Sequence, residues 1–360
     1  MDQHKERIER VRAKMKDAGL GQLIVTDPLG IYYLTGIYVV PFERFWAFLI
    51  NADSGEKLFA NLLFALGETG FDTDTHTDND DIADVVAPYI RPGVLGVDKN
   101  MPARFLLPVM DACKDTRAVL GSDCVDSVRA IKDEDEKRLM RRASEINDAC
   151  MEKLAAYFRD GVTERECTDY LDKCYDEYGC EGLAFDSIVS FGANAADPHH
   201  EPDDTVLREG DCIVVDIGCK KDRYCSDMTR TFFWKTASDH QIAIYNLVRE
   251  ANERAEAMVR SGVRLCDIDA AARDHIAAAG YGEYFTHRLG HFIGMEDHEK
   301  GDVSSVNPAP AETGMVFSIE PGVYLPGDLG VRVEDLVIVT DTGCEILNHV
   351  SKELRILGRD

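Results

Sequence analysis

The chain has 360 residues and a formal net charge of −26, and 45% of its residues are hydrophobic. A chain of this length is longer than most domains with a single hydrophobic core, so we expect two domains. The acidic surplus would repel a phosphate backbone, which excludes nucleic acid as a partner, and no apolar run approaches the ~18 residues of a membrane-spanning helix. The polar start has no signal-peptide pattern, so we expect a cytoplasmic protein.

The first part of the chain alternates helix and strand patterns. Apolar Ile8, Val11, Met15 and Ala18 recur at helical spacing ahead of Gly19, and a strand is predicted directly after them at 23–26. Further strands are predicted at 45–50, 57–60 and 94–98, and helices at 81–89 and 103–112. This order predicts an α/β domain.

The pattern changes near residues 127–133, where a long amphipathic helix begins with a run of acids. We therefore predict an N-terminal domain at 1–128 and a C-terminal domain at 129–360. Further helices are predicted from the capping box at Thr163, at 238–260 and at 267–279, with strands at 186–191, 212–217, 226–233, 315–319 and 331–340. Together they indicate an α+β domain with largely antiparallel strands, and it has no nucleotide-binding glycine motif.

Five side chains that can bind metals stand at the ends of strand-like segments: Asp216, Asp227, His291, Glu320 and Glu334. Asp216 follows the apolar run 213–215, where an uncompensated charge would be costly. A hairpin could bring Asp216 and Asp227 onto adjacent strands. Four carboxylates and one imidazole can hold two divalent cations and a bridging water as nucleophile, which indicates a two-metal hydrolase. For Glu320 or Glu334, a buried salt bridge with Arg332 is the alternative explanation.

Several histidines accompany the acids. His291 lies in a glycine-flanked segment that permits close backbone approach. A lone histidine is more often a structural hydrogen-bond donor, but His199, His200, His287 and His298 add more neutral-pH acid-base groups than packing requires. We expect some of them to contact substrate.

The five segments that carry the acids and His291, in this order over residues 130–357, resemble the M24 or pita-bread metallopeptidases: methionine aminopeptidase, aminopeptidase P and prolidase (Xaa-Pro dipeptidase). The segment 30–36, Gly-Ile-Tyr-Tyr-Leu-Thr-Gly, looks like that of a creatinase-type N-terminal domain. The resemblance implies a catalytic domain of the α+β pita-bread fold, with a curved, largely antiparallel sheet, behind an α/β N-terminal domain.

The resemblance also implies a role for each metal-binding side chain. Asp216 would chelate one metal, Asp227 and Glu334 would bridge the pair, and His291 with Glu320 would complete the ligand shell of the second metal. Two divalent ions per chain are implied, with manganese favoured over cobalt, zinc or iron.

Catalytic and substrate-binding residues follow from the same resemblance. Glu320 would handle protons, His199 and His298 would steady the scissile carbonyl or the tetrahedral intermediate, and Arg332 would orient the substrate. Two departures from the family pattern concern the pocket: Phe292, which could narrow it, replaces a common glycine, and Asp297 replaces an apolar residue.

The N-terminal domain favours the proline-specific branch of the family and implies a homodimer. We therefore expect a metallopeptidase that hydrolyses the Xaa-Pro bond of dipeptides. Three alternatives stay open: an aminopeptidase P that removes the residue before proline from longer peptides, a non-peptidase reaction of a small molecule on the same fold, and a binding protein with a vestigial metal site.

Overall fold

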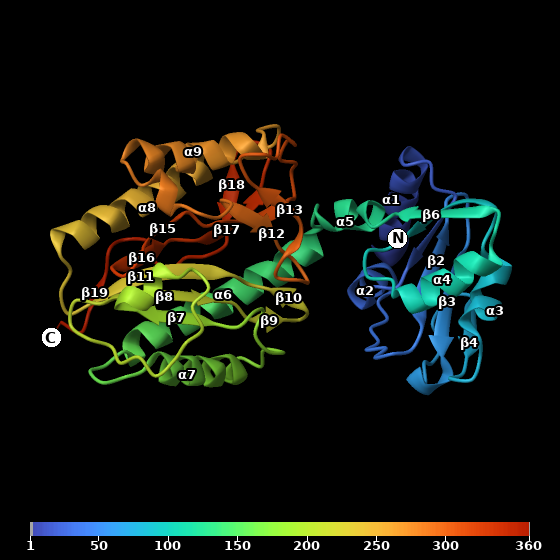
Figure 1. The fold of residues 1–360 in the computed structure, drawn as a ribbon, viewed down its shortest axis with the longest axis horizontal. Helices are drawn as coiled ribbons and strands as arrows, with labels where there is room; N and C mark the ends of the chain where they lie inside the picture. The colour runs from blue at the N-terminus through green and yellow to red at the C-terminus, as the bar shows by residue number, and fades with distance from the viewer. Residues whose placement is uncertain (1–2, 360) are drawn as a thin grey trace. The chain divides into compact units, whose positions relative to one another are not determined.

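The computed structural model describes residues 3–359 of the chain. Contacts divide the protein into two compact units, residues 1–129 and 130–360 (Figure 1). Within the described residues, no helix is long and apolar enough to cross a membrane.

The first unit is an α/β unit built on a six-stranded mixed sheet with the order β4-β3-β2-β1-β5-β6. Its strands are β1 (Gln22–Val25), β2 (Trp46–Asn51), β3 (Glu56–Asn61), β4 (Thr73–His76), β5 (Gly93–Val97) and β6 (Thr116–Leu120). Its α-helices are α1 (Gln3–Asp17), α2 (Pro28–Thr35), α3 (Ile82–Val86), α4 (Ala103–Ala112) and α5 (Asp123–Arg129), and they lie on both sides of the sheet (Figure 1). All four residues of β1 are buried, as expected for a central strand that is covered on both faces.

The second unit places strands between two helix pairs. The helices are α6 (Glu134–Tyr157), α7 (Glu164–Glu177), α8 (Asp239–Met258) and α9 (Leu265–Ala278), with α6 and α7 on one side of the strands and α8 and α9 on the other (Figure 1). One sheet has the order β19-β11-β8-β7, from β7 (Ile188–Phe191), β8 (Cys212–Ile217), β11 (Met228–Trp234) and β19 (Ile356–Leu357). The other has the order β13-β12-β14-β17-β18, from β12 (Gly290–Phe292), β13 (Glu299–Val303), β14 (Val316–Ile319), β17 (Asp335–Val339) and β18 (Cys344–Ile346). Two hairpins complete the unit, β9 (Lys220–Lys221) with β10 (Tyr224–Cys225) and β15 (Gly322–Leu325) with β16 (Leu329–Arg332).

Local capping chemistry starts three helices of this unit. Asp133, Thr163 and Ser238 each form a capping box at the N-termini of α6, α7 and α8, respectively. In each box the cap side chain accepts a hydrogen bond from a backbone N–H that the helix leaves unpaired. The helix starts predicted at these positions are confirmed.

The structure corrects two parts of the predicted element order. Several short elements were not predicted, because their segments lack a clear apolar period. They include the helices α2 and α5, the strands β4 and β6 of the first unit, and the strands β12, β13, β15, β18 and β19 of the second unit. The single strand expected at 331–340 is two strands: β16 pairs with β15, whereas β17 pairs with β14. The chain changes partners at Val333 and Glu334, so Glu334 lies outside both ladders.

Candidate metal centre

A cavity of about 450 Å³ in the second unit brings the predicted site residues together. Its lining includes every one of them: Asp216, Asp227, His291, Glu320, Glu334, His199, His298 and Arg332. Further polar residues of the same lining include His200, His287, Arg288 and Asp297.

Asp216 and Asp227 come from neighbouring antiparallel strands. In the ladder between β8 and β11, Asp216 lies opposite Thr229, and Asp227 immediately precedes β11. Gly218 permits this close approach, because a Cβ atom there would lie 2.2 Å from the Ser226 carbonyl oxygen. The predicted pairing of the two segments is confirmed, with the small β9-β10 hairpin between them.

His291 is held as a neutral imidazole that presents Nε2 to the acids. Its Nδ1 lies 3.3 Å from the carbonyl oxygen of Phe292, to which it can donate a hydrogen bond, and its Nε2 lies 3.4 Å from Asp227 Oδ2 and 3.5 Å from Glu320 Oε1. Burial lowers the pKa of His291 to about 3. A neutral ring with a fixed N–H on one nitrogen is the form in which histidine binds a metal through the other nitrogen.

The two glutamates enter the cavity from places where the backbone leaves the sheet. Glu320 directly follows β14, and Ser318 donates a hydrogen bond of 3.1 Å to its Oε1. Glu334 stands in the break between β16 and β17, and its Oε2 accepts a 2.6 Å hydrogen bond from Thr229. Ligand atoms of Asp227, His291 and Glu334 all lie within 4.8 Å of one another.

The acids destabilise one another's charged forms. Burial raises the pKa values of Asp227 and Glu334 well above the ordinary range, and neighbouring carboxylates raise them further, Glu334 and Asp216 for Asp227, and Glu320 and Asp216 for Glu334. Burial raises the pKa of Glu320 to about 8, with Arg332 acting in the opposite direction. Such a cluster needs positive charge in its midst.

Two buried oxygens mark where that charge belongs. Asp216 Oδ1 and Asp227 Oδ1 have no hydrogen-bond partner within residues 3–359, although polar atoms at such depth are normally paired. Carboxylate oxygens together with one neutral imidazole suit divalent cations such as Mn, Co, Fe or Zn. The residues present therefore fit a divalent metal centre.

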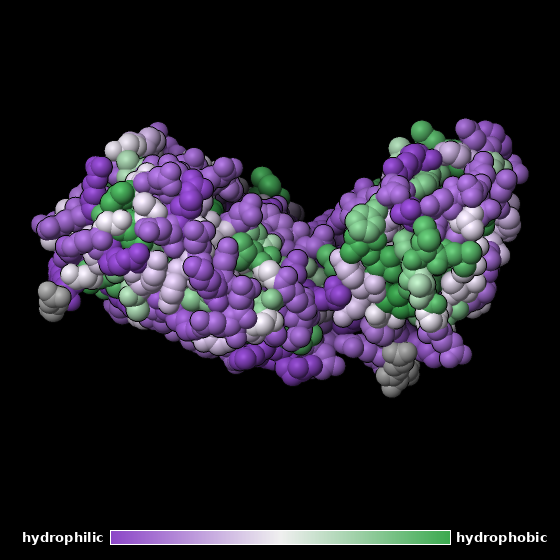
Figure 2. Space-filling model, turned by 90° about the horizontal axis from the view of Figure 1, so that it is seen from below, coloured by the Kyte–Doolittle hydropathy of each residue, from purple (hydrophilic) through white to green (hydrophobic). Residues whose placement is uncertain are grey.

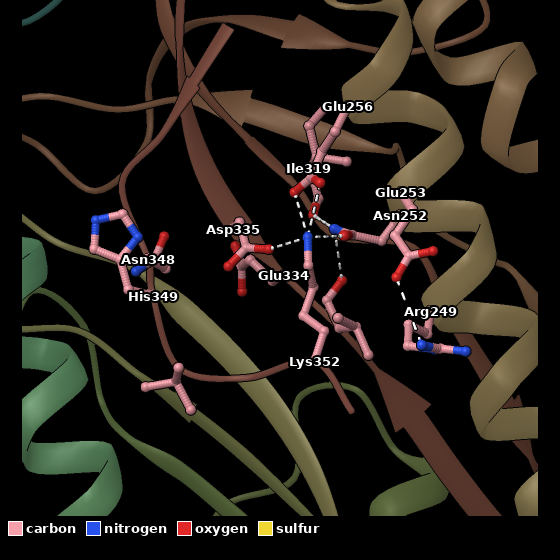
Figure 3. A network of polar contacts seen from close by, with 12 residues as sticks. Arg249, Asn252, Glu253, Glu256, Ile319, Glu334, Asp335, Asn348, His349 and Lys352 are labelled. Atoms are coloured by element: carbon pink, nitrogen blue, oxygen red, sulfur yellow. Dashed lines mark hydrogen bonds and ion pairs between the residues drawn. The ribbon is translucent and has the colours of Figure 1, made fainter. Parts of the chain in front are cut away.

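A charge network behind the cavity fixes the backbone that carries the glutamates (Figure 3). Lys352 Nζ lies 2.8 Å from Asp335 Oδ2 and 2.7 Å from Glu256 Oε2, and it donates a 2.8 Å hydrogen bond to Asn252 Oδ1. The Asn252 amide in turn donates a 2.8 Å hydrogen bond to the carbonyl oxygen of Ile319, the residue before Glu320. The network therefore reaches the backbone at the end of β14.

Arg230 approaches Asp335 from the other side. Its Nη2 lies 2.6 Å from Asp335 Oδ1, and its Nη1 donates a 2.6 Å hydrogen bond to the carbonyl oxygen of Glu334. Further hydrogen bonds run to the carbonyl oxygens of Thr229 and Val350. Arg230 and Asp335 are 1% and 0% exposed, so this pair holds Glu334 in place from within the core.

A buried glutamate organises the loop that carries His199. Glu164 lies at the start of α7 with its side chain fully buried, and His200 Nε2 lies 2.7 Å from its Oε2. The Asn194 amide and the Asp203 backbone N–H also donate hydrogen bonds to this carboxylate. His199 itself lies at the exposed edge of the loop, on the cavity lining.

The structure gives Arg332 a partner that the sequence did not indicate. Its Nη2 lies 2.6 Å from Asp216 Oδ2, its Nη1 2.6 Å from the Tyr324 hydroxyl oxygen and its Nε 2.9 Å from Thr229 Oγ1. The proposed salt bridge to Glu320 or Glu334 is therefore replaced by one to Asp216. This contact uses Oδ2 and leaves Asp216 Oδ1 available to a metal.

Tyr324 and His287 extend this hydrogen-bond chain. His287 Nδ1 can donate to the Arg288 carbonyl oxygen at 2.7 Å, so its Nε2 accepts from the Tyr324 hydroxyl at 3.0 Å. Burial lowers the pKa of His287 to about 4, which keeps this ring neutral. Tyr324 was not predicted as a site residue, because its contacts with His287 and Arg332 depend on tertiary packing that no local sequence pattern indicates.

Phe292 does not narrow the cavity. Its side chain points into the core, where its ring stacks on Phe317 at 5.5 Å between centroids and lies against Gly301. The ladder between β12 and β13 shifts register between His291 and Phe292, and Phe292 is 3% exposed and is not part of the cavity lining. A bulky residue at position 292 therefore leaves the cavity side of the strand unchanged.

The second unit holds a cavity lined by buried acids and a neutral imidazole. Such a donor set is typical of a metal-dependent hydrolase. The chain belongs to metallopeptidase family M24: the model of that family matches residues 138–341, and that of the creatinase/prolidase N-terminal domain matches residues 7–131. The protein is therefore a metallopeptidase with the creatinase/prolidase fold, and the fold class expected from the sequence is confirmed.

Relatives of known structure match almost the full length of the chain. It is 32% identical to a prolidase from Thermococcus sibiricus, with a TM-score of 0.90 over 99% of this chain and 100% of that one. It is 33% identical to the dipeptidase PepE from Mycobacterium ulcerans, with a TM-score of 0.92 over 99% of each chain. An uncharacterized peptidase of Staphylococcus aureus is 35% identical over 348 residues, covering 91% of this chain and 94% of that one.

Proposed function

We propose that this metallopeptidase binds two divalent cations and hydrolyses the Xaa-Pro bond of dipeptides. The observation that carries the proposal is that five donor side chains line one cavity, and that two of their oxygens, Asp216 Oδ1 and Asp227 Oδ1, are buried without a partner in residues 3–359. The prolidase and dipeptidase named above, which match the chain over almost its full length, support the substrate class.

The donor set divides between two ions in this proposal. Asp216 would chelate one, Asp227 and Glu334 would bridge the pair, and His291 with Glu320 would complete the shell of the other. When bound, the ions polarise the scissile carbonyl and lower the pKa of a water so that it can act as the nucleophile. Manganese is the ion that we propose.

The protein's own residues supply orientation and proton handling. Arg332 and Thr229 fix Asp216 and Glu334, respectively, through the hydrogen bonds described above. We assign proton transfer to Glu320, which lies beside His291 at the cavity, and contact with the scissile carbonyl to His199 and His298. Arg332 is additionally proposed to orient the substrate.

The test is cleavage of Ala-Pro and Ala-Pro-Gly by protein that has been stripped with a chelator and then reloaded with Mn, Co or Zn. We expect proline release from Ala-Pro only after metal is restored, with about two ions bound per chain by elemental analysis. Preferential removal of alanine from the tripeptide would identify an aminopeptidase P instead. A metal-loaded protein that cleaves neither peptide would refute proline specificity.

We also propose a homodimer. Large apolar side chains are exposed on the first unit at Tyr38, Val40, Phe42, Leu62 and Leu63, and Figure 2 shows apolar surface gathered over this unit on the face in view. Exposed patches of this kind often mark protein interfaces. Sedimentation should give twice the chain mass of 40.1 kDa, and Phe42→Glu should shift the equilibrium toward the single chain. A wild-type protein that sediments at 40.1 kDa would refute the proposal.

A further inference from the structure

We infer that Arg288 binds the free C-terminal carboxylate of the dipeptide and so selects dipeptides over longer peptides. This inference rests on the proposed function and names the residue that would set the length of its substrate. It follows from a difference between the two guanidinium groups that line the cavity.

The first of these groups is already engaged by the protein. The Arg332 side chain is 3% exposed, and its three nitrogens contact Asp216, Tyr324 and Thr229 at 2.6 to 2.9 Å. Its charge is balanced by the Asp216 carboxylate. A substrate carboxylate would have to compete with that ion pair.

The second group has no such partner. Arg288 is half-buried on the cavity lining, and its one hydrogen-bond partner among residues 3–359 is His298, whose Nδ1 lies 3.3 Å from Nη2. No carboxylate of the described chain lies within 4.0 Å of it. A guanidinium group has five N–H donors in a planar fork that matches a carboxylate, so Arg288 retains the donors for a paired contact.

Neighbouring residues hold Arg288 in place. Because Nδ1 of His298 accepts from Arg288, the ring proton lies on Nε2, which faces Asp297 Oδ2 at 3.4 Å. The backbone carbonyl of Arg288 accepts the hydrogen bond from His287 Nδ1. The guanidinium group and the backbone carbonyl of Arg288 are therefore both held by hydrogen bonds to cavity-lining residues. This reduces the conformational entropy that the side chain loses when it binds a ligand.

The charge distribution of the cavity makes a carboxylate-binding cation necessary for a dipeptide. In the metal-loaded centre, two divalent ions would offset the charges of Asp216, Asp227, Glu320 and Glu334. Arg332 is already paired within the protein, so Arg288 is the cation of the lining that is left for a free carboxylate near the bond to be cut. A longer peptide has a neutral amide at that position and gains little from Arg288. Arg288, which is not paired with a carboxylate of the described residues, therefore favours a dipeptide over a longer peptide.

The test compares Ala-Pro with its neutral analogue Ala-Pro-amide in manganese-loaded wild type, Arg288→Met, Arg288→Lys and Arg332→Met. For Arg288→Met we expect kcat/KM on Ala-Pro to fall about 30- to 100-fold, mainly through KM, with less than about a threefold change on the amide. Arg288→Lys, which keeps the charge without the fork, should recover part of the loss. Arg332→Met should lower turnover of both substrates together, because it releases Asp216.

Metal content and melting temperature of each variant show whether the protein is folded and loaded. Equal losses on both substrates in Arg288→Met, or no loss on Ala-Pro, would overturn the inference while the proposed function stands. Larger selective loss on Ala-Pro in Arg332→Met than in Arg288→Met would transfer the role to Arg332. If wild type cleaves neither substrate, the proposed function fails and this inference fails with it.

Discussion

Asp227→Asn is expected to lower metal-dependent turnover at least about 1,000-fold, the loss of about 4 kcal/mol of transition-state stabilisation that metal catalysis supplies. The side chain keeps its shape, but one of the two carboxylates proposed to bridge the ions becomes neutral. Steady-state kinetics on Ala-Pro and elemental analysis of bound manganese measure the effect. Full activity with two ions bound would refute the assignment of Asp227.

The same substitution is expected to stabilise the metal-free protein. Burial and the carboxylates of Glu334 and Asp216 raise the pKa of Asp227 well above 3.8, so folding is opposed at any pH where the unfolded chain would ionise this group. Asparagine removes that cost, so the Tm of the metal-free protein should rise near neutral pH. The sign requires the gain to shrink as pH falls toward 3.8, the ordinary pKa of the group, and to vanish below it, where the acid is protonated in both states.

A matched control lies five residues away. Asp222 is exposed in the turn between β9 and β10 with a φ of 49°, a conformation that asparagine also tolerates. Asp222→Asn should therefore leave turnover, metal content and Tm unchanged. Thermal unfolding with a chelator present, at pH 4 and pH 7.5, separates the two variants. A lower Tm of chelated Asp227→Asn at pH 7.5 would contradict the electrostatic account.

Arg230→Met is expected to destabilise the second unit by about 3–5 kcal/mol, because it removes one partner of a fully buried ion pair. Asp335 would keep Lys352 as its cation, but the carbonyl oxygens of Glu334 and Val350 would lose their donor. For a unit of this size the loss corresponds to about 6–20 °C in Tm. Manganese affinity should also fall about 10- to 100-fold, since Arg230 supports the backbone of Glu334.

The exposed pair between Arg165 and Asp204 provides the comparison. Its side chains are 57% and 85% exposed at 3.1 Å, so Arg165→Met should change stability by less than about 1 kcal/mol. Chemical denaturation of both variants, with and without manganese, measures the difference. Equal stability of Arg230→Met and wild type would show that the buried pair contributes nothing to the fold.

Sequence patterns predicted elements whose signal is local. The capping boxes at Thr163 and Ser238 and the apolar period of α1 each lie within a few residues of the element that they define. The division of 331–340 into β16 and β17 has no such local cause. Val331 to Val339 is rich in β-branched residues on both sides of the break, and the break arises because β15 and β14 pair with its two halves.

For the candidate centre, the sequence by itself determined the chemistry: four carboxylates and one imidazole at strand ends, a donor set that selects divalent cations because hard oxygen ligands prefer them. Only the tertiary structure decided how each donor is held. It paired Arg332 with Asp216. It joined Arg230 and Lys352 to Asp335, next to Glu334. Among residues 3–359, it gave Arg288 no carboxylate as an ion-pair partner. Such contacts span more than one hundred residues in some cases, so their partners are set by the packing of distant strands and not by local sequence.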